Sequence, residues 1–122
     1  NPYRINIGSI GVIPERYNNK LISPAYVVFE TANKLNPIYL TELLRTKLYK
    51  KYLDVIGTGS VRTSIQFSTI KNILIPLPDI KIQNEIVNQI ISMKQMSKQN
   101  LMKSKAVVEE ANLIIEEIIE NY

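Results

Sequence analysis

The sequence has no cysteine, no histidine and no tryptophan among its 122 residues. Without thiol and imidazole groups it cannot build zinc ribbons, disulfide scaffolds, Ser-His-Asp triads or histidine-based acid–base sites. Its longest apolar runs, such as Ile73 to Leu77, fall far short of the roughly 20 residues that cross a bilayer. These absences exclude most familiar enzyme mechanisms, and we expect no membrane-spanning segment.

An export signal is also lacking, because no basic stretch followed by an apolar core stands at the N-terminus. Together with the lack of cysteine, this predicts a protein of the reducing cytoplasm. The chain opens on Asn1 rather than on methionine, which suggests a fragment of a longer protein.

Carboxylates are few and scattered in the first part of the chain. Glu15, Glu30, Glu42 and Asp54 stand one to a segment, whereas a metal-dependent nuclease needs them clustered. No glycine loop after a strand marks a site for a methyl-donor cofactor. We therefore expect no catalytic activity, and no metal or cofactor bound by this chain.

What the sequence does have is an uneven distribution of charge. Residues 1–76 carry ten basic and four acidic side chains, and residues 77–122 carry five and seven. The net charges of the two parts are therefore +6 and −2. A cationic segment joined to a slightly acidic one predicts that only the first part faces a polyanion.

The first third of the chain shows strand signals. A β-branched run with two glycines at residues 3–13 predicts a strand and a turn. The Val-rich and aromatic run from Ala25 to Glu30 predicts a buried core strand, with Tyr26 and Phe29 in the core.

Helix signals follow. Asn36 and Pro37 are typical of a helix start, and leucines at spacings of three and four predict one helix from Pro37 to Leu53. Its apolar stripe includes Leu48 and Tyr52. A short turn capped by Ser68 should precede the extended, proline-containing residues 73–78. The expected fold class is α+β, a small β-sheet with a packed helix.

A single long helix should end the chain. Asp79 can cap it, and no glycine or proline occurs from Ile80 to Asn121. The result is a helix of about 40 residues, on the order of 60 Å long. We therefore divide the chain into residues 1–78, a globular part, and residues 79–122, a coiled-coil helix.

One face of this helix carries a seam with a coiled-coil spacing of three and four and one stutter. Both ends of the seam are apolar and its middle is polar, with four lysines from Lys94 to Lys105 and five glutamates after Ala106. We expect a helix interface formed by Ile86, Ile90, Met93, Leu101, Val108, Ala111, Ile115 and Ile118, with Ser97, Ser104 and Tyr122 completing the seam.

Several landmarks, taken in order and spacing, resemble the specificity subunit of type I restriction-modification enzymes. They are Gly8–Gly11, Leu21–Phe29, Gly59–Arg62 and Ile75–Pro78, followed by Gln83 and Ile86–Val87. The resemblance covers nearly the whole chain, as the later part of one target recognition domain plus its spacer helix. The family's helix begins with Glu-Gln, whereas Lys81 and Ile82 stand before Gln83 here, which removes acidic residues from its first turn.

The resemblance implies a subunit that recognises DNA without catalysing a reaction. Its expected partners are double-stranded DNA, the modification (methyltransferase) subunits and the restriction subunit. S-adenosylmethionine, Mg and ATP are expected only in those partner subunits. The implied location is the cytoplasm of a bacterium or archaeon.

Within this interpretation, Arg62 is the first candidate for reading a base, because arginine bound to guanine is the commonest specific contact. It follows Gly59 and Ser60, whose backbone and hydroxyl can approach a phosphate closely. Gly57 and Gly59 also serve simply to end a helix, which would leave Arg62 as an ordinary surface residue. Further phosphate contacts are expected from Arg4, Arg16, Lys20, Lys47, Lys50 and Lys51.

Two other functions stay open at this point. The chain is alternatively a helical oligomerisation or docking module that never contacts DNA, or the recognition domain of a single-chain restriction and modification enzyme. For the chain itself we expect a homodimer through the long helix. We expect its helices to run antiparallel, because the basic middle and acidic end then clash less than in parallel alignment.

Overall fold

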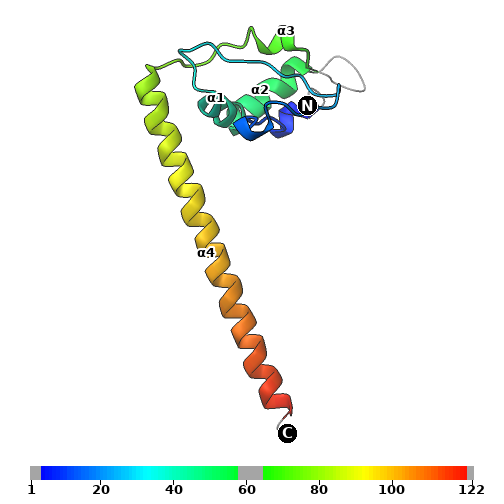
Figure 1. The fold of residues 1–122 in the computed structure, drawn as a ribbon, viewed down its shortest axis with the longest axis vertical. Coiled ribbons are helices and arrows are strands. Elements are labelled where there is room, and N and C mark those ends of the chain that lie inside the picture. The colour runs from blue at the N-terminus through cyan, green and yellow to red at the C-terminus, as the bar shows by residue number, and fades with distance from the viewer. Residues whose placement is uncertain (1–3, 58–64, 121–122) are drawn as a thin grey trace. The chain divides into compact units, whose positions relative to one another are not determined.

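The computed structural model describes residues 4–57 and 65–120, without the side chains of residues 117, 118 and 120. The chain divides into two compact units, Asn1–Glu85 and Ile86–Tyr122. The described elements are the 3₁₀-helices η1 (Ile5–Ile7) and η2 (Glu15–Tyr17) and the α-helices α1 (Pro37–Leu44), α2 (Lys47–Gly57), α3 (Phe67–Ile70) and α4 (Ile80–Glu120) (Figure 1).

The predicted α+β fold is wrong, because the described residues form helices and irregular segments and no strand. The run from Ala25 to Glu30 begins inside a turn, in which the Tyr26 N–H donates to the Ser23 carbonyl oxygen, and residues 27–30 adopt no regular secondary structure. A strand needs a neighbouring strand to bond its backbone, and no described segment pairs with this run. Tyr26, Val27 and Val28 consequently lie exposed. Residues 5–7, expected as strand, form η1 instead.

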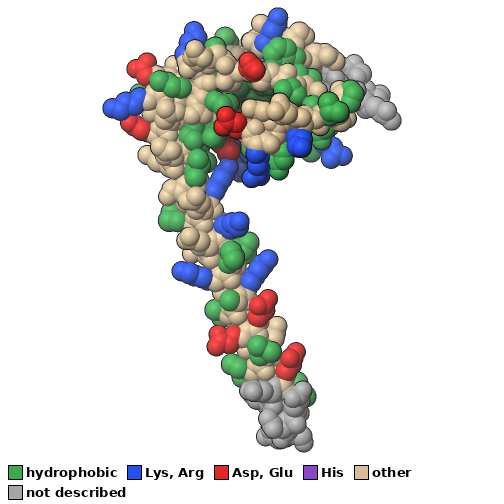
Figure 2. Space-filling view, viewed as in Figure 1, with side chains coloured by type: hydrophobic (Ala, Val, Ile, Leu, Met, Phe, Trp, Pro, Cys, Tyr) green, Lys and Arg blue, Asp and Glu red, His purple; other side chains and the backbone are tan. Residues whose placement is uncertain are grey.

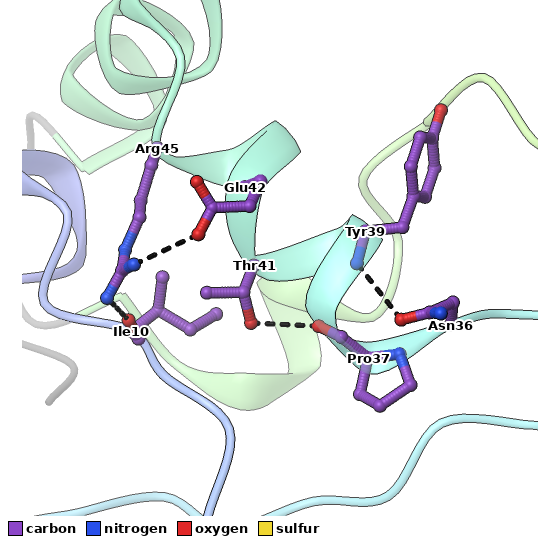
Figure 3. Close-up of polar contacts among 7 residues, drawn as sticks. All are labelled: Ile10, Asn36, Pro37, Tyr39, Thr41, Glu42 and Arg45. Carbon is purple, nitrogen blue, oxygen red and sulfur yellow. Dashed lines mark hydrogen bonds and ion pairs between the residues drawn. The ribbon is translucent and has the colours of Figure 1, made fainter. Parts of the chain in front are cut away.

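The start of α1 is as predicted. The Asn36 side-chain oxygen accepts hydrogen bonds from the backbone N–H groups of Ile38 (2.8 Å) and Tyr39 (3.2 Å), and Pro37 occupies the first helical position. Figure 3 shows the bond from Tyr39 to Asn36 together with the bond from the Thr41 hydroxyl to the Pro37 carbonyl oxygen (2.9 Å). The short polar side chain thus satisfies two backbone donors that a helix start leaves without partners.

The single helix predicted from Pro37 to Leu53 is in fact two helices. Thr46 separates them: its hydroxyl donates to the Leu43 carbonyl oxygen (2.8 Å), and the Tyr49 N–H donates to the same hydroxyl (3.4 Å). Thr46 therefore caps the start of α2. The break rotates α2 relative to the predicted stripe, so Leu48 is exposed and Leu53 is fully buried.

The core of the first unit is small and aliphatic. Ile5, Leu53 and Ile65 are its buried members, and Ile10, Ile56, Ile70 and Ile73 pack around them. α2 packs against both η1 and α1. This packing brings the beginning of the described chain onto the helix that carries most of the candidate lysines.

The long helix is observed as predicted, from Ile80 to Glu120. The Gln83 N–H donates to the Asp79 carbonyl oxygen (3.1 Å), which places Asp79 at the N-cap position. α3 is the short turn expected near Ser68, although its N-cap is Gln66.

Candidate nucleic-acid interface

The loop Gly8–Gly11 lies against α2 and depends on one glycine. Gly8 has a φ of +90°, a left-handed conformation, and its N–H donates to the Ile5 carbonyl oxygen at 2.9 Å. A Cβ atom at Gly8 would stand only 3.1 Å from Cε of Lys50. A side chain here would therefore be strained by the left-handed φ and would push the end of the Lys50 side chain slightly away.

Arg45, at the end of α1, holds the other side of this loop. Its Nη2 atom donates to the Ile10 carbonyl oxygen at 2.6 Å, and its Nη1 atom forms an ion pair with Oε1 of Glu42 at 3.2 Å (Figure 3). Because this guanidinium is already engaged by a carbonyl and a carboxylate, we assign it to holding the loop rather than to contacting a ligand.

The lysines of α2 form the densest cationic feature that the described residues share on one element. Lys50 and Lys51 follow Lys47 by three and four residues, which places the three side chains within about 100° of one another around the helix. We call this set the α2 lysine face. Lys47 and Lys51 are exposed, and Lys50 is partly buried against Gly8.

One acidic residue borders this face. Asp54 lies one helical turn after Lys50, and its Oδ1 atom accepts a hydrogen bond from the Asn6 side chain at 2.7 Å. The bond ties η1 to α2 and engages one oxygen of the carboxylate. The α2 lysine face therefore keeps a positive excess of two charges when Asp54 is counted with it.

The remaining predicted contacts come from other segments. Arg4 is exposed just before η1, Lys20 is exposed after η2, and the Arg16 guanidinium carbon lies 4.9 Å from the centroid of the Tyr17 ring. Figure 2 shows Lys and Arg side chains at separate places over the first unit. The structure thus groups the three α2 lysines and leaves Arg16 and Lys20 on a different segment.

The residues predicted to read DNA bases and approach phosphates, Arg62, Ser60 and Gly59, lie outside the described residues. What the structure does show is the two ends between which they lie. One is the C-terminal end of α2, at Gly57, and the other is the buried core residue Ile65.

Sequence reasoning missed the residue that anchors α4 in the first unit. Gln83 is fully buried, and its side chain accepts from the Asn36 N–H (2.9 Å) and donates to the carbonyl oxygens of Lys34 (2.9 Å) and Pro78 (2.7 Å). Its signal in the sequence was its place in the family-like pattern, which gave no hint of this role. Gln83 links the loop before α1 to the first turn of α4.

Two tyrosines hold the extended segment that leads into α4. The Tyr39 hydroxyl donates to the Pro76 carbonyl oxygen and the Tyr49 hydroxyl to the Leu74 carbonyl oxygen, both at 3.0 Å. Burial raises the pKa of Tyr49, and the neighbouring Tyr39 and Tyr52 raise it further. The Tyr49 hydroxyl therefore acts as a neutral donor at physiological pH.

An apolar groove occupies another part of the first unit. Phe29 and Phe67 stand with ring centroids 5.2 Å apart, and Leu35, Leu44, Ile70 and Ile75 line the hollow beside them. Glu30 and Lys71 also belong to its lining. The prediction that Phe29 and Tyr26 lie in the core is wrong: Phe29 is partly buried and lines this groove, and Tyr26 is exposed.

Among the residues that the structure describes, no group of three or more acidic side chains is arranged to hold a metal ion. Among the described helices, none combines the length and apolarity needed to cross a bilayer.

Comparison with known proteins gives one match. The family described as type I restriction modification DNA specificity domain matches residues 3–110. No curated protein and no solved structure matches the chain.

Proposed function

Because the chain belongs to the type I restriction modification DNA specificity family, we propose that the α2 lysine face and Arg62 are its contacts with double-stranded DNA. A domain of this family recognises the DNA target within a restriction-modification complex and is not itself catalytic. The observation that supports this location is the clustering of Lys47, Lys50 and Lys51 on one side of α2.

The lysines supply affinity without sequence information. Lys47 and Lys51 stand one turn apart, about 6 Å along the helix axis, and each DNA strand carries a phosphate roughly every 3.4 Å of axis. Exposed lysines at this spacing can reach neighbouring phosphates and release condensed cations. Lys50, whose side chain lies beside Gly8, provides a third charge.

Base reading is assigned to the segment after α2. Arg62 has the donor geometry to recognise guanine, and Gly59 and Ser60 allow close backbone approach to a phosphate. Arg4, Arg16 and Lys20 extend the proposed contact with phosphates, because they are exposed cations of the same unit. In this scheme the lysines position the domain and Arg62 distinguishes the target.

Because membership of the specificity family implies such partners, we propose that this chain works in an assembly with modification and restriction subunits and that cofactor use belongs to those subunits. We assign S-adenosylmethionine to the modification subunit, and Mg and ATP to the partner subunits. Since such a complex acts on chromosomal and incoming DNA, the proposal includes a location in the cytoplasm of a bacterium or archaeon.

The chain also self-associates in this proposal. α4 leaves large apolar side chains exposed along its length, among them Met93, Leu101, Val108 and Ile115, each more than half exposed. Such a surface is normally covered. A second copy, with its α4 running antiparallel, is the proposed cover, with the interface residues Ile86, Ile90 and Ala111 joining these four; Ile118 belongs to the sequence-predicted set, and its side chain is not described.

The test compares two pairs of substitutions that remove equal charge. We expect Lys47→Gln with Lys51→Gln to reduce the slope of log affinity against log salt by about 1.8, at about 0.9 per phosphate contact. Lys98→Gln with Lys103→Gln, on α4, should leave the slope unchanged. Anisotropy of a labelled random duplex across a salt series measures both pairs.

Equal slopes for the two pairs would contradict the location of the interface on α2. No complex even at low salt would instead favour the assembly module that never contacts DNA. Arg62→Ala, tested in the reconstituted complex, should relax discrimination between target and random DNA, and unchanged discrimination would remove Arg62 from this role.

A further inference from the structure

The longest run of exposed residues that the structure describes in the first unit extends from Gly11 to Val28. Every residue in it is exposed, so none of its side chains belongs to the core. We call it the 11–28 loop. It nevertheless carries eight large apolar side chains, those of Val12, Ile13, Tyr17, Leu21, Ile22, Tyr26, Val27 and Val28.

Both ends of the 11–28 loop are held on the rest of the unit. Before it, Ile10 packs against the aliphatic core, and its carbonyl oxygen accepts the hydrogen bond from Arg45 at 2.6 Å. After it, the ring of Phe29 lies against that of Phe67. The first end adjoins the α2 lysine face, because Gly8 lies beside the Lys50 side chain. The loop therefore starts at the surface that the proposed function assigns to DNA.

Local hydrogen bonds give the loop a defined shape without burying it. The Tyr17 N–H donates to the Pro14 carbonyl oxygen (2.9 Å), and the Lys20 N–H donates to the Tyr17 carbonyl oxygen (3.0 Å). Further along, the Ala25 N–H donates to the Ser23 hydroxyl at 3.3 Å. These turns satisfy part of the backbone locally, so the loop keeps its shape while its side chains stay in solvent.

Leu21 is the most exposed large apolar side chain among the described residues. Its relative exposure is 103%, so the rest of the chain covers no part of it. A single exposed apolar side chain is ordinary on a protein surface. Leu21 differs from that case because Ile22 beside it is also half exposed and because Arg16 and Lys20 lie within five residues of it.

The residues around Leu21 have the composition of a minor-groove reader. Residues 16–22 contain one arginine, one lysine and two asparagines and no acid, and Glu15 is the one acid of the whole loop. Arginine, lysine and asparagine read the minor groove of DNA, and apolar side chains that insert between base pairs accompany them in proteins that bend the duplex. An irregular loop also suits this groove, which is only about 6 Å wide and does not admit a helix.

We propose that Leu21 is a wedge that enters the minor groove of duplex DNA and opens one base step, with Arg16 and Lys20 on the flanking phosphates. The proposal rests on the proposed function and deepens it, because it adds a deformation of the DNA to the contacts of the α2 lysine face. Such a wedge discriminates between sequences at a position where no base edge is contacted.

The balance of effects makes the wedge sensitive to sequence. Burying a leucine side chain is worth about ten- to a hundredfold in an equilibrium constant. Separating two stacked base pairs costs a factor of similar size. The two effects nearly offset each other, so the ease of opening the step decides whether Leu21 inserts. Pyrimidine–purine steps open most readily, and we therefore expect a preference for a TA or CA step at this position.

A protein surface is the rival occupant for the exposed apolar side chains of the loop. Two observations favour DNA. No acidic residue occurs from Arg16 to Phe29, which suits a polyanion. The loop also continues from the α2 lysine face through Gly8 and Ile10, so one duplex can contact both.

The test measures DNA bending by the full chain. A duplex of about 120 base pairs is shorter than the persistence length of DNA, so its two ends rarely meet and ligase closes few circles. A protein that kinks the duplex brings the ends together. We expect the unmodified chain to raise the rate of circle formation by about tenfold or more.

Two variants of Leu21 and one matched control isolate the wedge. Leu21→Ala should return circle formation to within about twofold of DNA alone, whereas Leu21→Met keeps a long apolar side chain and should retain most of the effect. Leu74→Ala should change nothing, because Leu74 is 91% exposed in the same unit but lies outside the loop. Neither leucine is packed, so all three variants should fold. Their salt dependence of binding should match that of the unmodified chain, because no phosphate contact is lost.

The outcomes separate the wedge from the DNA interface. If the chain binds duplex DNA in the anisotropy assay but Leu21→Ala forms circles as fast as the unmodified chain, the wedge is overturned and the α2 lysine face is unaffected. An equal loss of circles in Leu74→Ala and Leu21→Ala also overturns it. So does unchanged bending by Leu21→Ala with weakened binding of the modification subunit, which indicates a protein contact. Absence of any complex at low salt overturns the proposed function, and the wedge with it.

Discussion

Gln83→Ala should be the most damaging single substitution in the first unit outside its aliphatic core. The Gln83 side chain is fully buried and bonds three backbone groups, those of Lys34, Asn36 and Pro78. Truncation removes all three partners together. A buried donor or acceptor left without a partner costs about 1–3 kcal/mol.

Taking the lower value for each group, because the bonds are only partly buried, the loss is about 3 kcal/mol. A small domain has about 5–15 kcal/mol of total stability, so this is a large fraction. At about 4–8 °C per kcal/mol for a unit of this size, the melting temperature should fall by more than about 10 °C.

The assay is urea unfolding followed by tyrosine fluorescence, because six of the seven tyrosines lie in residues 1–85. Gln89→Ala, an exposed glutamine on α4, is the matched control and should change the midpoint little. Gln83→Glu keeps the shape and one acceptor but cannot donate to two carbonyls when ionised, so it should also be destabilised. If Gln83→Ala and Gln89→Ala unfold within about 0.5 kcal/mol of each other, the anchoring role of Gln83 is refuted.

Two further predictions concern the loop beside α2 and the tyrosine that holds the segment before α4. Gly8→Ala should destabilise the chain by about 1–2 kcal/mol through its left-handed φ, and Gly11→Ala, whose nearest atom is 4.0 Å away, should not; equal urea midpoints for the two would contradict this. Tyr49→Phe should cost about 0.5–1.5 kcal/mol by removing the bond to Leu74. Because burial raises the pKa of Tyr49, its contribution is complete below pH 10 and declines as the pH rises above that value. A stability profile from pH 8 to 11 should therefore fall less steeply in Tyr49→Phe, and identical profiles would argue against it.

Local signals predicted the helices that depend on local chemistry. The Asn36 side chain and the ring of Pro37 act within one helical turn. These two adjacent residues were therefore enough to predict the start of α1. The run without glycine or proline after Asp79 likewise predicted α4 almost to its last residue. The family resemblance, read from short segments in order, was confirmed by the match over residues 3–110.

The errors arose where the outcome depended on a distant partner. The Ala25 to Glu30 run has the composition of a strand, but composition cannot supply the neighbouring strand that its backbone needs. Thr46 is a local exception: the leucine spacing predicts it inside one helix, but its hydroxyl bonds to Leu43 and Tyr49, each three residues away, and caps a new helix. The exposure of Leu48 and the burial of Leu53 follow from that break.

By itself, the sequence determined the family, the absence of cysteine and histidine, the excess of positive charge in the first part, and a long uninterrupted helix. These properties depend on which residues are present and on their spacing along one continuous helix. Only the tertiary structure decided that Arg45 is engaged with Ile10 and Glu42 while Lys47 and Lys51 are exposed, and that Gln83 joins α4 to the first unit. Those outcomes depend on contacts between residues up to 49 positions apart in the chain, which no local pattern of residues encodes.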